Sequence, residues 1–191
     1  MRNNLLLHIA ARCVASSLKT NASTFTTGSF TASGFMSLAV DHTRTTPPEP
    51  DANSFDLPDL LRLHQATGAP VVLDILHHQI NNRSRIPLGQ ALGLALATWP
   101  RGVRPKIHFS TQRTEAHILP DRSGRIRQVL APQAGQHADY VNPFEFASMI
   151  ANTRGLPSFD IMLEAKAADL ALLRLREDLR RYAPEVAALV W

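Results

Sequence analysis

The sequence predicts an α/β fold made of parallel strand–helix–strand units, and three observations support this prediction. From residue 54 onward, helical stripes of apolar residues alternate with short apolar strands, and the connections between them are short. Three of the predicted strands end in ionisable residues that share one face of the sheet. The chain of 191 residues is 45% apolar, which is enough to bury one substantial core.

The first predicted elements are a helix, a strand and a second helix. Asp56 can cap a helix that has Pro58 in its first turn, and Gly68 ends that helix. Residues 71–74 then form a short buried strand, which a polar loop follows. Pro87 opens the second helix, whose apolar residues repeat at helical spacing.

The later elements continue the alternation. Residues 106–110 are predicted to form a strand, followed by a long loop with a turn at residues 121–125. A capping box begins a helix over residues 143–152. Residues 159–164 form the last strand, and residues 166–181 form a strongly amphipathic helix.

The N-terminal part differs in composition. Residues 1–52 are predicted to form an irregular or degenerate segment, and residues 53–191 the ordered part. Residues 16–33 contain ten Ser or Thr and no acidic residue. Three interpretations remain open: a transit peptide, a secretory signal with its apolar core at residues 5–14, and the remnant of a longer N-terminal half, which we prefer. Prolines within residues 47–50 form a stiff joint.

Charge and cysteine content limit the classes of function only weakly. The formal net charge of +4 is compatible with an acidic partner such as DNA, but most of the excess lies in the first 40 residues. Arginine outnumbers lysine 17 to 3, which suits phosphate contacts and is equally expected from a biased base composition. The single cysteine, Cys13, cannot form an internal disulfide, which favours a reducing, cytoplasmic compartment. We expect no membrane partner because no apolar run has membrane-spanning length.

Polar side chains gather where the predicted strands end. Because side chains alternate along a strand, Asp74 lies on the face opposite its apolar neighbours. Lys106 and His108 share a face in the next strand, and Glu164 takes the equivalent position in the last. If helices cover the apolar face, these polar groups point inward at the carboxyl edge of the sheet, where parallel α/β barrels hold their catalytic groups.

Two loops add further candidates to this edge, and together they predict a metal site. A single histidine near a strand end is usually structural, but agreement among several strand ends in face and ligand type favours metal binding. Without cysteine, the donors suit Mn²⁺ first, with Zn²⁺ or Mg²⁺ as alternatives. Such a cluster can lower the pKa of a bound water and neutralise a phosphate. Lys106 could simply pair with a carboxylate. The candidate metal ligands are Asp74, His77, His108, His137, Asp139 and Glu164.

At these residues the sequence resembles the UV-damage endonuclease family. The resemblance covers about residues 53–191, and the segments keep the order and approximate spacing of the family's blocks. The block that contains Glu164 is the most specific. Four segments carry the resemblance: VVLDILHH at residues 71–78, KIHFS at 106–110, HADY at 137–140 and FDIMLEAK at 159–166.

The resemblance implies a partial TIM (β/α)8-type barrel that contains only the late strands and helices. It also implies a nuclease that nicks damaged double-stranded DNA on the 5′ side of UV photoproducts and other lesions, with up to three divalent metals. Asp74, His108 and Glu164 match metal ligands of the family, and His77 and His137 match ligands of a further metal. Asp139 is added as a candidate ligand. Lys106 matches a lysine close to the metals that can be carboxylated, and we regard Lys106 and Glu164 as the candidate catalytic residues.

The sequence also departs from the family pattern. A full barrel needs about 250 residues, and the early blocks, with two histidine ligands and the residues that probe the lesion, find no match. The bridging glutamate expected on the strand before Val71 is not found either, and Asp41, within residues 38–42, is its nearest stand-in. An incomplete barrel leaves an open sheet edge, which a partner chain or the N-terminal segment must cover.

The loop between His108 and His137 is longer than the family needs. Its arginines either contact the DNA backbone or belong to a solvated insertion. These arginines are Arg113, Arg122, Arg125 and Arg127.

Three functions are compatible with these observations. The first is an active UV-damage endonuclease, which the late-strand ligands support. The second is an inactive or degenerate fragment of that family, because half of the barrel is missing. The third is a metal barrel of the sugar isomerase or epimerase type, whose sites use similar ligands. Basic residues around the metal would favour the nuclease, and a closed aromatic pocket would favour the isomerase.

Overall fold

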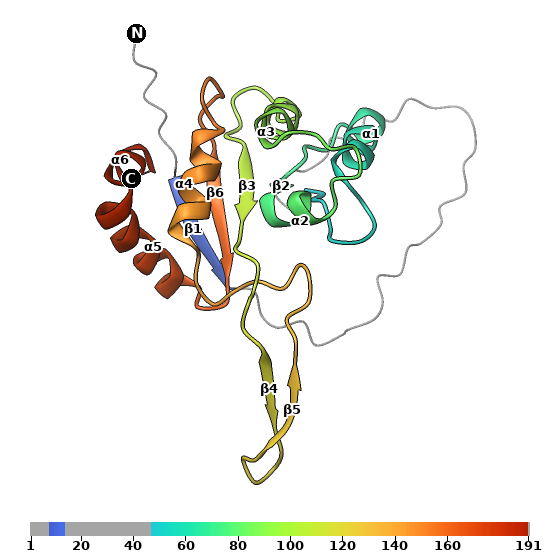
Figure 1. The fold of residues 1–191 in the computed structure, drawn as a ribbon. Helices are drawn as coiled ribbons and strands as arrows, with labels where there is room; N and C mark the ends of the chain where they lie inside the picture. Colours follow the sequence, from blue (N-terminus) through green and yellow to red (C-terminus); the bar gives the residue numbers. More distant parts are fainter. Residues whose placement is uncertain (1–7, 14–46, 191) are drawn as a thin grey trace, which may run out of the picture.

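A four-stranded parallel sheet forms the centre of the computed structural model, which describes residues 8–13 and 47–190. The strands lie in the order β1-β6-β3-β2 (Figure 1). They are β1 (His8–Cys13), β2 (Leu73–Asp74), β3 (Lys106–Phe109) and β6 (Asp160–Ala165). Every pair in this sheet is parallel, so the predicted α/β class is confirmed.

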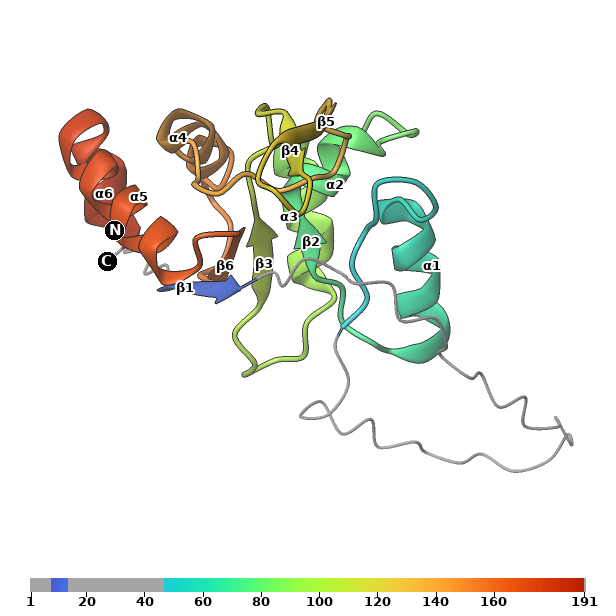
Figure 2. The ribbon, with the colours of Figure 1, turned by 90° about the horizontal axis from the view of Figure 1, so that it is seen from below.

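Helices lie in an arc along one side of the sheet (Figure 2). Helix α5 packs against β1 and α4, and α3 packs against β2 and α1. No helix within the described ranges is long and apolar enough to cross a membrane. The helices are α1 (Leu57–Thr67), α2 (Ile75–Ile80), α3 (Leu88–Ala97), α4 (Pro143–Ala151), α5 (Asp169–Tyr182) and α6 (Pro184–Val190).

The core lies between the sheet and these helices, and it uses the strand residues that alternate with the polar ones. Ile107 and Phe109 of β3, with Ile161 and Leu163 of β6, are at most 2% exposed. Phe109 meets Phe146 of α4 edge to face, with ring centroids 5.2 Å apart. Apolar side chains therefore occupy the helix-covered face, and the opposite face remains for the ionisable residues.

The helices and strands predicted from residue 54 onward are confirmed, with small shifts at their ends. The last long helix begins at Asp169, three residues later than predicted. Residues 166–168 form a turn instead, with Ala168 at a positive φ of 48° and its N–H bonded to the carbonyl of Ala165.

Five elements were not predicted. Strand β1 lies within residues 1–52, and its pairing with β6 is a long-range contact that no local pattern announces. Helix α2 occupies the predicted polar loop, and α6 follows α5 directly. Within the predicted long loop, β4 (His117–Pro120) and β5 (Ile126–Leu130) pair as an antiparallel hairpin around the predicted turn.

The ring contact in the core yields a test of the fold. We expect Phe146→Ala to lower the free energy of unfolding by about 3–5 kcal/mol, because the ring of Phe146 is fully buried and its removal leaves a cavity in the core. The matched control is Phe144→Ala on the same helix, whose side chain is 64% exposed; its expected cost is below about 1 kcal/mol. Urea unfolding followed by circular dichroism measures both. Equal losses for the two variants would contradict this arrangement of α4.

Candidate metal centre

The carboxyl edge of the parallel sheet brings three of the predicted residues together. Asp74 ends β2 and is the register partner of His108 in β3. His108 in turn pairs with Met162, so Glu164 lies two residues further along β6 on the same face. The predicted orientation of these strand ends is therefore confirmed.

Glu49 joins this edge from a segment that runs beside β2. Val72 donates its backbone N–H to the carbonyl of Pro48 at 3.1 Å, which holds the segment against the strand. Oε2 of Glu49 then lies 2.6 Å from Nδ1 of His108. Sequence analysis missed Glu49 because the prolines around it suggested only a stiff joint. The extended backbone that prolines impose was the available signal.

Glu49 is a carboxylate next to β2 that the sequence analysis did not consider for the bridging glutamate. The stand-in suggested from the sequence, Asp41 within residues 38–42, lies outside the described residues. Glu49 is an alternative to Asp41 for that position, because its carboxylate lies against the histidine of β3.

Two groups of side chains at this edge have the spacing of metal ligands. One is Asp74, His77 and His137, and the other is Glu49, Asp74 and His108; in each group the ligand atoms lie within 4.8 Å of one another. Asp74 belongs to both groups, so the two candidate sites share a carboxylate.

Glu164 lies between the two groups. Its Oε1 is 3.3 Å from Nδ1 of His108, and its Oε2 is 4.0 Å from Nδ1 of His137. The side chain of Glu164 is 9% exposed. Its two oxygens therefore face a histidine of each group.

Local structure fixes the orientation of Asp74 and His77. Oδ1 of Asp74 accepts the backbone N–H of His77 at 2.9 Å and so caps helix α2. Nδ1 of His77 lies 3.0 Å from the carbonyl oxygen of Pro50. Because a carbonyl only accepts, Nδ1 carries the proton and the lone pair of Nε2 is available to a cation.

A glycine makes room for the His77 ring. Gly135 has a positive φ of 81°, and a Cβ at this position would lie 3.0 Å from Ala52 and 3.9 Å from Nε2 of His77. A larger residue at position 135 would therefore be strained and would crowd both the ring and the segment that carries Glu49.

Burial perturbs the ionisation of these groups. Asp74 is fully buried, and burial raises the pKa of its carboxyl despite the opposing effect of His77. Burial alone would lower the pKa of His108, but the adjacent carboxylates, Glu49 foremost, raise it. Burial lowers the pKa of His137. The protein alone therefore disfavours the charged forms of Asp74 and His137 and favours that of His108.

The pattern of hydrogen bonds fits a bound cation. Oδ2 of Asp74, Nδ1 of His108 and Nδ1 of His137 are buried and make no hydrogen bond within the described part of the chain. The close approach of His108 to Glu49 lacks hydrogen-bond geometry. Buried polar atoms are almost always satisfied, and ligand atoms that converge without hydrogen bonds are expected around an ion. Nitrogen and oxygen donors without sulfur suit Mn²⁺, Zn²⁺ or Mg²⁺.

Two other predicted site residues, Lys106 and Asp139, also stand outside both groups. Lys106 is half-buried at the amino end of β3, on the same face as His108 but two residues before it. Asp139 is exposed, and its side chain does not reach either group, although it is only two residues from His137.

The four predicted DNA-binding arginines lie on the segment between β3 and His137. Arg113 is half-buried and donates from Nε to the carbonyl of Glu115 at 3.1 Å. Arg122, Arg125 and Arg127 are exposed on the β4–β5 hairpin.

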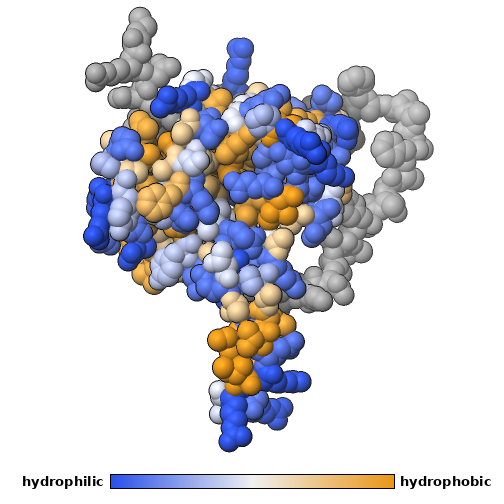
Figure 3. Space-filling model, viewed as in Figure 1, coloured by the Kyte–Doolittle hydropathy of each residue, from blue (hydrophilic) through white to orange (hydrophobic). Residues whose placement is uncertain are grey.

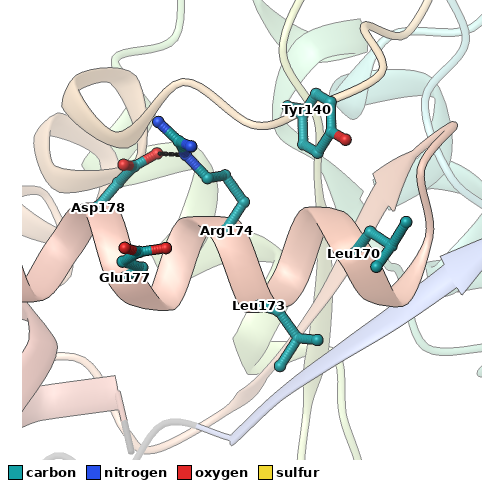
Figure 4. Close-up of a pocket in the computed structure, with 6 residues that line it drawn as sticks. All are labelled: Tyr140, Leu170, Leu173, Arg174, Glu177 and Asp178. Carbon is teal, nitrogen blue, oxygen red and sulfur yellow. Dashed lines mark hydrogen bonds and ion pairs between the residues drawn. The ribbon is translucent and has the colours of Figure 1, made fainter.

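A surface pocket beside α5 does not contribute to the centre (Figure 4). It contains no histidine, and Arg174 donates from Nε to Asp178 at 2.9 Å, so its strongest charges satisfy each other. Its lining residues are Tyr140, Leu170, Leu173, Arg174, Glu177 and Asp178.

A parallel sheet with helices outside, and histidines and carboxylates at its carboxyl edge, defines an α/β protein of the barrel class. Comparison with known proteins identifies the family. The family model described as UV-endonuclease UvdE matches residues 39–190, and the chain belongs to this family.

Individual relatives agree with this assignment. The UV DNA damage endonuclease of Halalkalibacterium halodurans is 31% identical over 141 residues, which are 70% of this chain and 37% of that protein. The protein of the same name from Bacillus velezensis is 32% identical over 133 residues, 69% of this chain and 37% of the relative. The chain thus spans little more than a third of the curated relatives it matches.

A solved structure extends the comparison to the fold. The crystal structure of SacUVDE matches with a TM-score of 0.54 and 29% identity, over 70% of this chain and 38% of that one. The prediction of a partial TIM barrel is therefore confirmed.

Sharing of Asp74 between two groups yields a prediction about metal affinity. We expect Asp74→Asn to weaken Mn²⁺ binding at least about 100-fold, because both candidate sites lose a carboxylate. In EDTA the same variant should be about 1 kcal/mol more stable than wild type, because the asparagine keeps the helix cap and removes a buried charge. Calorimetric titration with MnCl₂ and urea unfolding measure the two effects. Asp139→Asn is the neighbouring control and should bind Mn²⁺ within about twofold of wild type. Equal affinity of Asp74→Asn and wild type would contradict the shared-ligand arrangement.

Proposed function

We propose that this chain contributes the metal centre of a DNA-repair endonuclease that incises damaged double-stranded DNA on the 5′ side of UV photoproducts and other lesions. The observation that carries the proposal is the pair of ligand groups joined by Asp74 at the carboxyl edge of a UvdE-family sheet. The relatives are named UV DNA damage endonucleases, which favours this function over a sugar isomerase or epimerase.

The ligand groups suggest how the centre is divided. Asp74, His77 and His137 would hold one divalent ion, and Glu49, Asp74 and His108 would hold another. Glu164 faces a histidine of each group and would complete both. We prefer Mn²⁺, with Zn²⁺ or Mg²⁺ as alternatives. When bound, such ions lower the pKa of water and neutralise the charge of a phosphate.

The protein's own contribution is to hold the ligands in place. The Pro50 carbonyl keeps the proton of His77 on Nδ1, which leaves the lone pair of Nε2 available to a cation. The backbone N–H of His77 fixes Oδ1 of Asp74, which leaves Oδ2 for the shared position. Burial of Asp74 and His108 excludes bulk water from these side chains, so their attraction to a bound cation would be strengthened.

Lys106 has a supporting place in this proposal. It lies on the face of His108, closer to the amino end of β3. We assign its side chain a role in modulating metal binding or activity, and Arg113, Arg122, Arg125 and Arg127 a role in binding the DNA backbone. A partner chain would cover sheet edges that the described residues leave open.

The proposal is tested by a nicking assay on a duplex with one defined photolesion, with and without Mn²⁺. We expect metal-dependent incision 5′ to the lesion, reduced at least about 100-fold by Glu164→Gln, because the variant removes the carboxylate charge that faces a histidine of each group. Glu145→Gln is the control, since Glu145 is exposed on α4. If the folded, Mn²⁺-loaded wild type does not nick the duplex, the hypothesis of an active endonuclease is wrong and that of an inactive fragment of the family is retained.

Lys106 is tested separately. Lys106→Met should slow incision by about 10- to 100-fold while Mn²⁺ affinity stays within about twofold of wild type, as for a group that supports the ligands without binding the ion. Single-turnover nicking and calorimetry give the two values. A parallel fall in Mn²⁺ affinity would make Lys106 a ligand, and an unchanged rate would remove it from the centre.

A further inference from the structure

The β4–β5 hairpin projects from the carboxyl end of β3, away from the body of the protein (Figure 1). All residues from 120 to 131 are exposed, so the rest of the described chain covers neither face of its outer half. Strands of four and five residues make a ribbon roughly 15 Å long. A two-stranded ribbon that stands alone in solvent buries little apolar surface and is only marginally stable. This indicates that the hairpin packs against another molecule when the protein functions.

One face of the hairpin is apolar. Ile118 pairs directly with Val129, and Pro120 pairs with Ile126 across an irregularity in register, so these side chains lie on one face. Ile118, Val129 and Ile126 are 54%, 58% and 64% exposed. The space-filling view shows the resulting hydrophobic patch on the projecting arm (Figure 3).

The tip of the hairpin is basic. Residues 111–136 hold four arginines and two acidic residues. One of these acids, Asp121, is engaged in the turn, where it accepts the backbone N–H groups of Ser123 and Arg125. Arg122, Arg125 and Arg127 form no ion pair with another described residue. The exposed charge of the outer hairpin is therefore positive.

The base of the hairpin is tied to the candidate metal centre. Gln112 and His137 form an antiparallel bridge between its two legs. Arg113 donates its backbone N–H to Gln136 at 2.7 Å, and Gly135 donates to Oε1 of Gln112 at 2.8 Å. A candidate ligand thus lies on one leg, and the arm leaves the protein directly beside the centre.

We propose that the β4–β5 hairpin is a DNA-binding arm that enters the major groove of the duplex next to the metal centre. The inference rests on the proposed function, because it takes duplex DNA as the substrate. The major groove is about 12 Å wide and admits a two-stranded β-ribbon. The arginines of the tip contact phosphates, and the apolar face contacts base edges such as the thymine methyl groups. A second copy of this chain is a less suitable partner for the hairpin, because two hairpins of the same positive charge repel each other.

The charge of the tip is tested by Arg122→Gln/Arg125→Gln. The measurement is equilibrium binding, by fluorescence anisotropy in EDTA, to a labelled duplex with one photolesion at several NaCl concentrations. We expect binding about tenfold weaker at 0.1 M NaCl and a salt slope reduced by about two, because two phosphate contacts are lost. Arg101→Gln/Arg154→Gln changes the same charge in the turns before β3 and β6 and should bind as wild type does. Wild-type affinity and slope in the tip variant would overturn the proposal.

The apolar face is tested by Ile118→Thr/Val129→Thr, which keeps β-branched side chains in the ribbon. We expect binding several-fold weaker with an unchanged salt slope, because no phosphate contact is removed. Val103→Thr, at an exposed apolar position before β3, is the control. Circular dichroism and thermal unfolding confirm that each variant is folded. If this variant turns a dimer into a monomer in sedimentation experiments and binds DNA as wild type does, the face serves self-association and the groove contact is wrong.

The two proposals fail separately. If Glu164→Gln loses incision while both hairpin variants nick and bind DNA normally, the proposed endonuclease activity is supported and the proposed DNA-binding role of the hairpin is wrong. A wild type that binds DNA through the hairpin but does not nick would retain the arm and overturn the proposed activity.

Discussion

Burial of the Asp74 carboxylate is the constraint on which the rest of the site depends. The side chain is fully enclosed, and only one of its oxygens is bonded, to the backbone N–H of His77. An isolated buried charge is costly, so the surroundings must compensate for it. The histidines and carboxylates from β3, β6, the segment before β2 and the leg of the hairpin supply donors that fit a bound cation.

Parallel pairing explains why this constraint can be met by residues distant in sequence. Each parallel strand runs toward the same edge, so the last residues of β2, β3 and β6 meet there without any local signal connecting them. The alternation of side chains then divides each strand between the core and the site, which is why Phe109 packs on Phe146 while His108 faces Glu49.

How much the sequence could predict follows from this division. Alternation and capping are local, so the helices, the strand ends and the facing of Asp74, His108 and Glu164 were predictable. Glu49 was not, because its place depends on a backbone bond from Val72 to Pro48 that has no pattern of its own. Strand β1 and the β4–β5 hairpin were missed for related reasons: one forms only by pairing with β6, and the other lies where polar composition suggested a loop. Asp139 is close to His137 in sequence but is exposed and belongs to neither ligand group, which shows that proximity along the chain does not fix the direction of a side chain.

The bridge between Gln112 and His137 joins the hairpin to the candidate metal centre at one point of the backbone. The hairpin extends roughly 15 Å into solvent from that point. His137 lies at the base of the hairpin, whereas Asp74 and Glu164 are held in the sheet or at its edge. A candidate ligand and an exposed ribbon therefore share one stretch of backbone, so a substitution that changes the path of the hairpin legs would also shift an imidazole of the centre.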